Sequence, residues 1–139
     1  MKIPTKLYKK IINVLPILCV DAIVINEGKF LLVKRKNKPK KGSWWVPGGR
    51  ILRGETAETA LHRKIKEELG IRIKALKCLG YYEYHFKENN FGGKNGIHTL
   101  SIVFLAKPLS LDVILDSQGS SWKFSKTLPK DFIIKPFKK

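Results

Sequence analysis

Residues 49–71 read GRILRGETAETALHRKIKEELGI, and this stretch decides the fold. Its apolar residues recur at every fourth position, at Ala57, Leu61, Ile65 and Leu69. This period predicts an amphipathic helix over about residues 55–69, which ends at Gly70 because glycine readily takes the left-handed conformation of a helix C-terminus. Glu67 and Glu68 lie in the last turn, where neighbouring carboxylates offer the hard oxygen ligands that Mg²⁺ prefers. We therefore predict a helix that presents carboxylates to a metal ion.

The spacing of the polar residues around this helix is also informative. Eight residues match the signature G-x5-E-x7-R-E-U-x-E-E-x-G-U of Nudix hydrolases, in which U is a bulky aliphatic residue: Gly49, Glu55, Arg63, Ile65, Glu67, Glu68, Gly70 and Ile71. A solvated amphipathic helix with i,i+4 charge pairs would explain Glu58 and Lys66, but not the flanking glycines. The chain thus resembles this family. The resemblance implies an enzyme that uses Mg²⁺, or Mn²⁺ in its place, to cleave a nucleoside diphosphate linked to another group.

Two cations of the predicted helix bear on the metal site. Arg63 lies one turn before Glu67 and can hold a carboxylate of the preceding loop, such as that of Glu55, through a forked contact. Lys64 stands where the signature has glutamate, one turn before Glu67 and Glu68. A cation there removes one carboxylate and competes with a metal ion. We therefore expect a site for one Mg²⁺ rather than several.

The chain of 139 residues is 43% hydrophobic and contains no repeat or linker. We predict one domain over residues 1–139 with an α+β fold, an α/β/α sandwich around a mixed sheet. The longest apolar stretch, residues 11–25, is too interrupted and too short for a bilayer span of about 20 apolar residues. Cys19 and Cys78 lie far apart, which disfavours a disulfide framework and makes the cytoplasm the expected location.

The remaining hydrophobic pattern predicts strands around the central helix. We expect strands at residues 18–25, 29–35, 44–47, 71–76, 79–86, 97–107 and 122–124. The opening segment predicts a helix that ends at Pro16, and residues 128–134 predict a short closing helix. Residues 108–121 are ambiguous.

The net charge of +17 attracts polyanions. It comes mostly from scattered lysines, and no standard nucleic-acid-binding motif is present, so a nucleic-acid partner is the weaker expectation. The densest basic cluster, KRKNKPKK at residues 34–41, would equally gather anionic nucleotides towards a nearby site.

Beyond the central helix, the chain resembles GDP-mannose mannosyl hydrolases over roughly residues 14–125. The resemblance lies in the stretches VLPILCVDAIVINEGKFLLVKRKNKP, GSWWVPGGRI and YHFKENNFGG. Enzymes of this family lack some signature glutamates, as this chain does at Lys64, and they release GDP and mannose when water attacks the sugar C1. The resemblance also implies a homodimer.

The same resemblance assigns the metal ligands. It implies that one Mg²⁺ is held by the Gly49 carbonyl, Glu68 and Gln118, with the substrate diphosphate completing the shell. Glu67 stands beside these ligands as a further carboxylate.

The resemblance also assigns the substrate-binding residues. Arg35 and Arg50 match arginines that bind the diphosphate and stabilise the leaving group, and Asp21 matches a residue that contacts the sugar. His85 and His98 match histidines, which makes them candidates for substrate binding and catalysis. The alternative interpretation is a polar strand residue for Asp21 and ordinary strand-surface histidines for the other two.

One departure from this family concerns the general base, a group that typically contributes about 10²–10⁴-fold to the rate. The family has a histidine directly after the metal-binding glutamine, whereas this chain has Gly119. His98, His85 or Asp116 can replace it, or the reaction is slower. The chain can also have moved to ordinary pyrophosphate cleavage with Glu67 as the base. Thr99, in place of a family tyrosine, further weakens a mannose-specific interpretation.

Two other functions stay open from the sequence alone. One is a pyrophosphohydrolase of ADP-ribose, of other nucleoside diphosphate sugars or of nucleotides. The other is a protein of the same fold that binds nucleotides or RNA without turnover, which Lys64, Gly119 and the positive charge would suit.

Overall fold

The computed structural model describes residues 3–36, 41–87, 95–115 and 119–137. In chain order, its helices and strands are α1 (Thr5–Val14), β1 (Ile17–Asn26), β2 (Lys29–Arg35), β3 (Trp44–Trp45), β4 (Gly48–Arg50), α2 (Ala57–Leu69), β5 (Ile73–Phe86), β6 (Ile97–Pro108) and β7 (Gly119–Ser125). Neither helix of these described stretches is long and apolar enough to cross a membrane.

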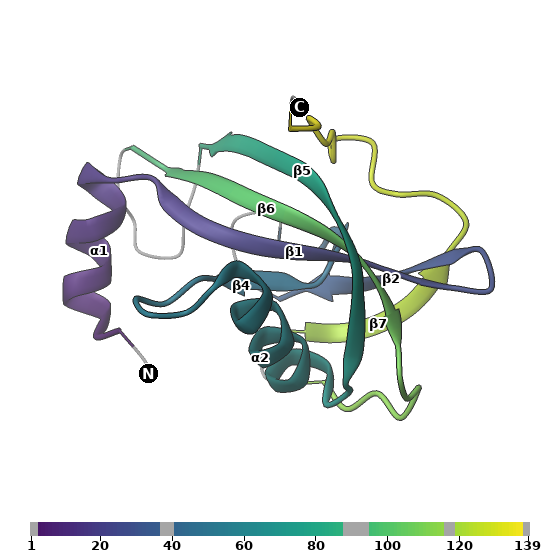
Figure 1. Cartoon of the computed structure of the whole chain (residues 1–139). Coiled ribbons are helices and arrows are strands. Elements are labelled where there is room, and N and C mark those ends of the chain that lie inside the picture. The colour runs from purple at the N-terminus through teal and green to yellow at the C-terminus, as the bar shows by residue number, and fades with distance from the viewer. Residues whose placement is uncertain (1–2, 37–40, 88–94, 116–118, 138–139) are drawn as a thin grey trace.

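The strands form one mixed sheet, as predicted (Figure 1). Its main order is β3-β2-β1-β6-β5, with β4 paired to the first half of β1 and β7 paired to β2. β1 and β6 run parallel, and the other pairs are antiparallel. Because side chains alternate between the two faces of a sheet, this register fixes which residues of β1 and β6 lie on the same side.

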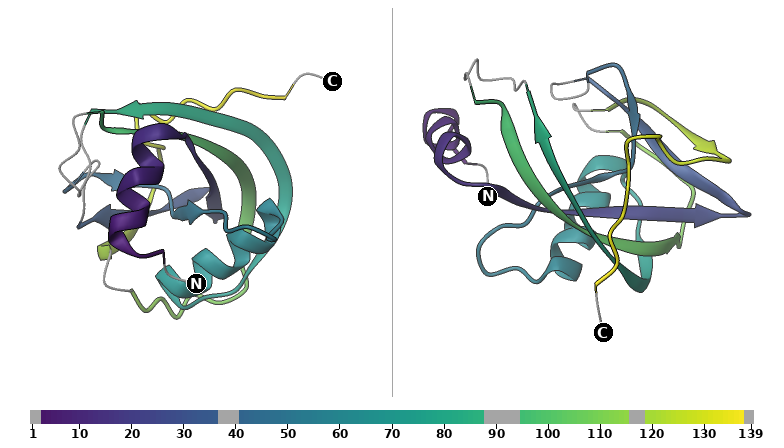
Figure 2. Two further views of the ribbon diagram at one scale, coloured as in Figure 1. Left: turned by 90° about the vertical axis from the view of Figure 1, so that its left-hand side faces the viewer. Right: turned by 90° about the horizontal axis from the view of Figure 1, so that it is seen from above.

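Different elements pack on the two faces of the sheet (Figure 2). On one face, here called the α2 face, Val20 and Val24 pack with the buried residues of α2: Ala60, Leu61, Ile65 and Leu69. On the opposite face, Ile23 packs with Phe132 of the C-terminal segment. At the end of that opposite face, α1 packs Ile12 against Ile17 and Ile97. The predicted α+β fold, with helices on both sides of a mixed sheet, is confirmed.

The central helix begins two residues later than the predicted start. Thr56 is its N-cap, and the Thr56 side-chain oxygen accepts a hydrogen bond from the Thr59 amide at 3.1 Å. At the other end, Gly70 has φ 69°, the left-handed conformation that the sequence predicted.

Two predictions for the second half of the chain are wrong. The two strands expected at residues 71–76 and 79–86 are one strand, β5, whose register shifts between Ala75 and Lys77 and again between Cys78 and Gly80. Such irregularities break the alternation that marks a strand in a sequence. The predicted closing helix at residues 128–134 is a turn followed by extended chain, because Lys135 pairs with Tyr81 of β5 through two backbone hydrogen bonds.

Candidate active site

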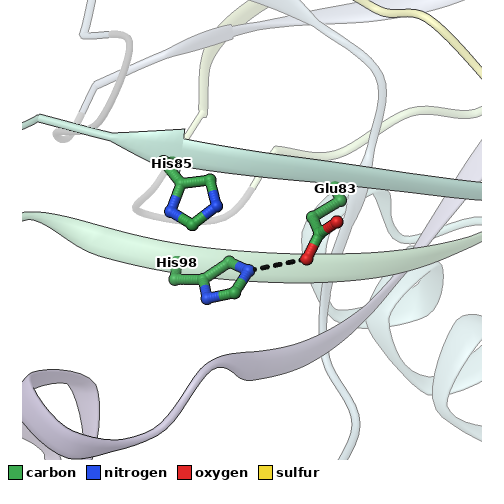
Figure 3. A group of neighbouring side chains, drawn as sticks. All are labelled: Glu83, His85 and His98. Atoms are coloured by element: carbon green, nitrogen blue, oxygen red, sulfur yellow. Dashed lines mark hydrogen bonds and ion pairs between the residues drawn. The ribbon is translucent and has the colours of Figure 1, made fainter.

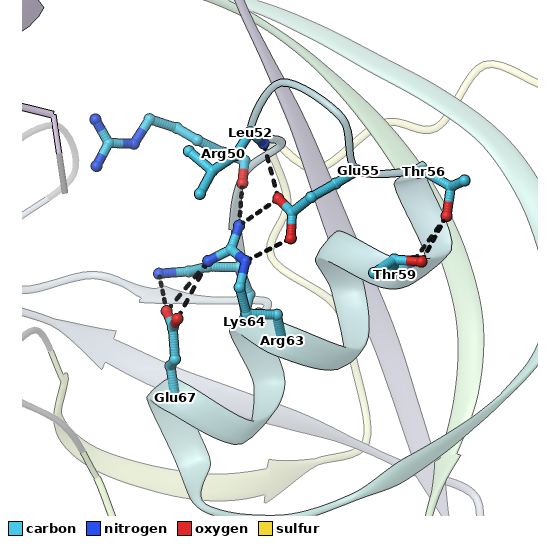
Figure 4. Close-up of polar contacts among 8 residues, drawn as sticks. All are labelled: Arg50, Leu52, Glu55, Thr56, Thr59, Arg63, Lys64 and Glu67. Atoms are coloured by element: carbon cyan, nitrogen blue, oxygen red, sulfur yellow. Dashed lines mark hydrogen bonds and ion pairs between the residues drawn. The ribbon is translucent and has the colours of Figure 1, made fainter. Parts of the chain in front are cut away.

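The loop between β4 and α2 is tied to the helix by Arg63 (Figure 4). The Arg63 guanidinium donates to both Glu55 carboxylate oxygens at 2.7 and 2.9 Å and to the Arg50 carbonyl at 3.0 Å. The Leu52 amide donates to the same carboxylate at 2.8 Å. These bonds to the ionised form lower the pKa of Glu55 to about 2. The forked contact expected from the sequence is present, and it fixes the loop against α2.

The last turn of α2 carries the carboxylates expected to hold a metal ion. Glu67 accepts from Arg63 at 3.3 Å and lies 3.6 Å from the Lys64 ammonium. Glu68 is half-buried beside it. The Lys64 side chain lies directly over Gly49, where a Cβ would overlap its methylene carbons. Lys64 therefore occupies the position between β4 and Glu67, next to the expected metal site.

The register of β4 decides which of its carbonyls is available. The Ala22 amide donates to the Pro47 carbonyl and the Ile51 amide donates to the Leu18 carbonyl, both at 3.0 Å. In an antiparallel pair, alternate residues turn their polar groups to the partner, so Gly49 faces β1 and Gly48 faces the other edge. The Arg50 carbonyl, on that same edge, meets Arg63. This geometry favours the Gly48 carbonyl over the predicted Gly49 carbonyl as a metal ligand.

Asp21 lies on the other side of β4, buried on the opposite face of the sheet. Burial raises the pKa of its carboxyl to about 7, and a hydrogen bond from Ser101 and the charge of Arg35 only partly oppose this rise. A Cβ at Gly48 would overlap the Asp21 carboxylate. Asp21, Arg35 and Gly48 are therefore close to one another.

Arg50 extends onto the same opposite face, at its α1 end. Its guanidinium lies 4.3 Å from the centre of the Tyr8 ring, and it is paired in register with Cys19. Burial, followed by the charge of Asp21, raises the pKa of the Cys19 thiol to about 12. The thiol therefore stays protonated at neutral pH and is a poor nucleophile.

The structure separates the two predicted histidines from Asp21. His85 and His98 are direct cross-strand partners, and their rings stack with centroids 3.9 Å apart. Asp21 shares its face with Ser101, three residues after His98, so strand alternation puts both histidines on the α2 face. Gln118 and Asp116 lie outside the described residues.

Two contributors to the site were missed in the sequence. Ser101 contacts the Asp21 carboxylate, and the polar alternation of Thr99 and Ser101 within an otherwise apolar strand was the signal that could have found it. The resemblance assigned the metal-binding carbonyl to Gly49, and the ladder of β4 makes the Gly48 carbonyl a further candidate.

Comparison with known proteins shows the family to which the chain belongs. Residues 15–127 match the family profile described as NUDIX domain. The chain belongs to the Nudix family. Among solved Nudix structures, a MutT NUDIX hydrolase from Burkholderia pseudomallei superposes with a TM-score of 0.70 and 27% identity, covering 88% of this chain and 90% of that one. The chain is a Nudix hydrolase.

Two Nudix relatives have informative names. The low-salt glycan biosynthesis protein Agl8 of Haloferax volcanii is 32% identical over 122 residues, which is 88% of this chain and 78% of that protein. An ADP-ribose pyrophosphatase of Methanocaldococcus jannaschii is 41% identical over 99 residues, which is 71% of this chain and 52% of that protein. The chain thus spans about half the length of the second relative.

Nudix hydrolases use a divalent metal, and the residues present fit one. A solved Nudix relative, a bifunctional NMN adenylyltransferase/ADP ribose pyrophosphatase from Francisella tularensis, was crystallised with AMP and a manganese ion; its TM-score is 0.65 at 26% identity, covering 86% of this chain and 38% of that one. Here the Glu67 and Glu68 carboxylates and the Gly48 carbonyl are hard oxygen donors of the kind that Mg²⁺ and Mn²⁺ take. The Lys64 ammonium beside Glu67 already supplies one positive charge there.

Proposed function

We propose that this Nudix hydrolase cleaves nucleoside diphosphate sugars, with the diphosphate lying across the free edge of β4. The observation that carries the proposal is the placement of charged side chains on both sides of β4, a strand of three residues. The carboxylates of Glu67 and Glu68 lie on its α2 side. Asp21 and Arg50 lie on the opposite face, with Arg35 beside Asp21. No strand among the described residues pairs with the other edge of β4.

The names of the relatives support this substrate class. A relative named for glycan biosynthesis suggests a sugar, and one named ADP-ribose pyrophosphatase suggests a nucleoside diphosphate joined to a sugar. A nucleoside diphosphate sugar contains both groups. The strongly basic chain suits such an anionic substrate.

In the favoured mechanism, water attacks a phosphorus atom of the diphosphate. Glu68 and the Gly48 carbonyl would hold the divalent metal, proposed to be Mg²⁺, which would neutralise the diphosphate and make the attacking water more acidic. Glu67 takes the proton from the attacking water. Of the other carboxylates in the Nudix signature, Glu55 is bound by Arg63 and Glu68 is assigned to the metal. Arg35 and Arg50 stabilise the negative charge that develops on the leaving phosphate.

Arg63 is a positioning residue in this mechanism. It holds Glu55 and the Arg50 carbonyl, and it also contacts Glu67. Through these bonds it fixes the loop, β4 and the proposed base relative to one another. A misplacement of about 1 Å can lower a rate about 10²-fold, so this role matters for turnover even without substrate contact.

The second candidate is attack of water on the sugar C1, as the resemblance to GDP-mannose mannosyl hydrolases implies. The observation in its favour is Asp21, a buried carboxyl beside Arg35 that is suited to contact a sugar hydroxyl. Against it, Gly119 replaces the family's histidine base, and His98 lies on the other face of the sheet from Asp21. We therefore rank it second.

The test is the identity of the nucleotide product. GDP-mannose and ADP-ribose are incubated with the full chain and Mg²⁺, and the products are separated by ion-exchange chromatography. Phosphorus attack yields a nucleoside monophosphate and a sugar phosphate, whereas carbon attack yields a nucleoside diphosphate and free sugar. Glu68→Gln should abolish either reaction, and Glu58→Gln, a charge-matched change at an exposed site of the same helix, should leave it unchanged. Absence of turnover with every nucleoside diphosphate sugar would reject the proposal.

A further inference from the structure

Two histidines and a glutamate form a compact group on the α2 face of the sheet, where β5 ends and β6 begins (Figure 3). His85 and His98 are direct partners across the antiparallel β5–β6 pair, and Glu83 lies two residues before His85. Residues two apart on a strand share a face, so the register itself brings the three side chains together. None of them belongs to the Nudix box around α2.

The distances within this group suit a metal ion. One ligand atom from each of Glu83, His85 and His98 can be chosen so that all lie within 4.8 Å of one another. The His98 Nε2 lies 2.9 Å from a Glu83 carboxylate oxygen. Zinc bonds of about 2.0–2.1 Å in tetrahedral geometry put ligand atoms roughly 3.3 Å apart. Small side-chain rotations of His85 would therefore complete three corners of a tetrahedron.

The ligand types of this group favour a different metal ion from the one expected at the Nudix signature. Imidazole nitrogens suit Zn²⁺, Cu²⁺ and Ni²⁺, whereas Mg²⁺ favours carboxylates and water. We infer that Glu83, His85 and His98 form a separate Zn²⁺ site with three protein ligands and a water-filled fourth position. The group is accessible, because Glu83 and His85 are exposed and His98 is half-buried.

Such a site would join two strands of the sheet. The metal bridges β5 to β6 just before Phe86 and just after Ile97, residues that pack in the cluster with α1. Bound Zn²⁺ therefore stabilises the end of the sheet that carries α1. Lys135 lies near enough to Glu83 to interact with its charge, and this cation works against metal binding. The inference does not depend on the proposed hydrolase activity.

The remaining histidine provides a matched control. The chain has three histidines, and the third, His62 on α2, also faces a glutamate, with Nε2 3.7 Å from Glu58. Both residues of this pair are exposed. Among the described residues, no third potential metal ligand forms a group with them. A His62→Ala variant thus removes a histidine and a His–Glu contact without touching the proposed site.

The experiment measures Zn²⁺ binding to the untagged full chain by competition with a chromophoric chelator. Excess Mg²⁺ is present to occupy the candidate metal site at Glu67 and Glu68. We expect one Zn²⁺ per chain. His85→Ala and His98→Ala should each weaken binding by more than about 10-fold, since even changes to outer-shell partners of a metal cost 10–100-fold. His62→Ala should bind as the wild type does. Co²⁺ in place of Zn²⁺ should give the visible absorption of a tetrahedral site, which His98→Ala loses.

Two results would overturn the inference. One is binding weaker than millimolar in the wild type; the other is equal binding by the wild type and both histidine variants. Circular dichroism of the metal-free variants checks that they fold, and Glu83→Gln offers a third change that keeps the side-chain shape. Histidine ring ¹⁵N shifts on Zn²⁺ addition give an independent readout: shifts at His62 alone would also reject the site.

Discussion

Asp21 is a buried carboxyl whose folded pKa, about 7, lies above the 3.8 of an exposed aspartate. The folded state therefore holds the proton more tightly than the unfolded state does. The stability that this group contributes is fully present below about pH 4 and is lost as the pH rises through about 7.

This loss of stability with rising pH leads to a prediction for Asp21→Asn, which removes the ionisable carboxyl group. Measured by urea unfolding, the stability of the variant relative to the wild type should improve between about pH 4 and about pH 8. The improvement should reach about 4 kcal/mol at most, since one pKa unit corresponds to about 1.4 kcal/mol. A stability difference that does not change with pH would show that Asp21 is not the group described here. Catalytic activity of the variant should fall if Asp21 contacts the sugar.

Lys64 is the second residue with a specific consequence. Its ammonium lies 3.6 Å from Glu67, and its side chain covers Gly49. Lys64→Glu should restore the missing carboxylate of the Nudix signature and raise the number of Mn²⁺ ions bound at the box from one to two, measured by titration calorimetry and electron paramagnetic resonance.

Lys66→Glu is the matched control for this change. Lys66 lies in the same turn, is exposed and receives the same change of charge. It should still bind one Mn²⁺. Two ions bound by the wild type, or one ion bound by Lys64→Glu, would contradict the role assigned to Lys64.

At the scale of elements, β4 offers a comparison of two adjacent glycines. A Cβ at Gly48 would overlap the Val20 carbonyl and the Asp21 carboxylate, whereas a Cβ at Gly49 would overlap only the flexible Lys64 side chain. Gly48→Ala should therefore destabilise the chain by about 3 kcal/mol, the upper range for overpacking, and Gly49→Ala by about 1 kcal/mol. Thermal and urea unfolding measure both. Combining Gly49→Ala with Lys64→Ala should recover most of the smaller loss, and equal losses in the two single variants would contradict the packing around β4.

Elements with one regular period could be predicted from the sequence. The central helix and β2 follow directly from their patterns, since α2 keeps its apolar residues four apart and β2 lies between two clear turns. β5 was divided in two because two register shifts interrupt its alternation. The C-terminal segment, predicted as a helix, is extended instead, and its buried Phe132 packs against the sheet residues Trp45 and Tyr82.

The candidate site was predictable where it is local in sequence. The Arg63–Glu55 contact joins two residues only eight positions apart, one on α2 and one in the loop before it, and the spacing of the Nudix signature indicated it. Which side chains share a face is a property of strand register, and no single strand contains that information. For this reason the sequence grouped His98 with Asp21, and it did not separate the Gly48 carbonyl from that of Gly49.

At the scale of the whole molecule, the charge of +17 should act on association with an anionic substrate. Raising the KCl concentration from about 0.05 M to about 0.5 M shortens the screening length severalfold and should lower kcat/KM by about 10-fold. kcat itself should change little, because groups in direct contact with the substrate are screened less. Initial rates at matched Mg²⁺ measure both constants. A kcat/KM that is independent of salt would show that the lysine-rich surface has no part in substrate capture.

The measurement that tests the proposed reaction most directly is hydrolysis of a nucleoside diphosphate sugar in H₂¹⁸O, followed by ³¹P NMR and mass spectrometry of the products. Attack on phosphorus, with Glu67 as the base and Arg35 and Arg50 at the leaving group, predicts ¹⁸O in the nucleoside monophosphate or the sugar phosphate. Label found only in the free sugar, with unlabelled nucleoside diphosphate, would contradict phosphorus attack and establish attack at the sugar carbon.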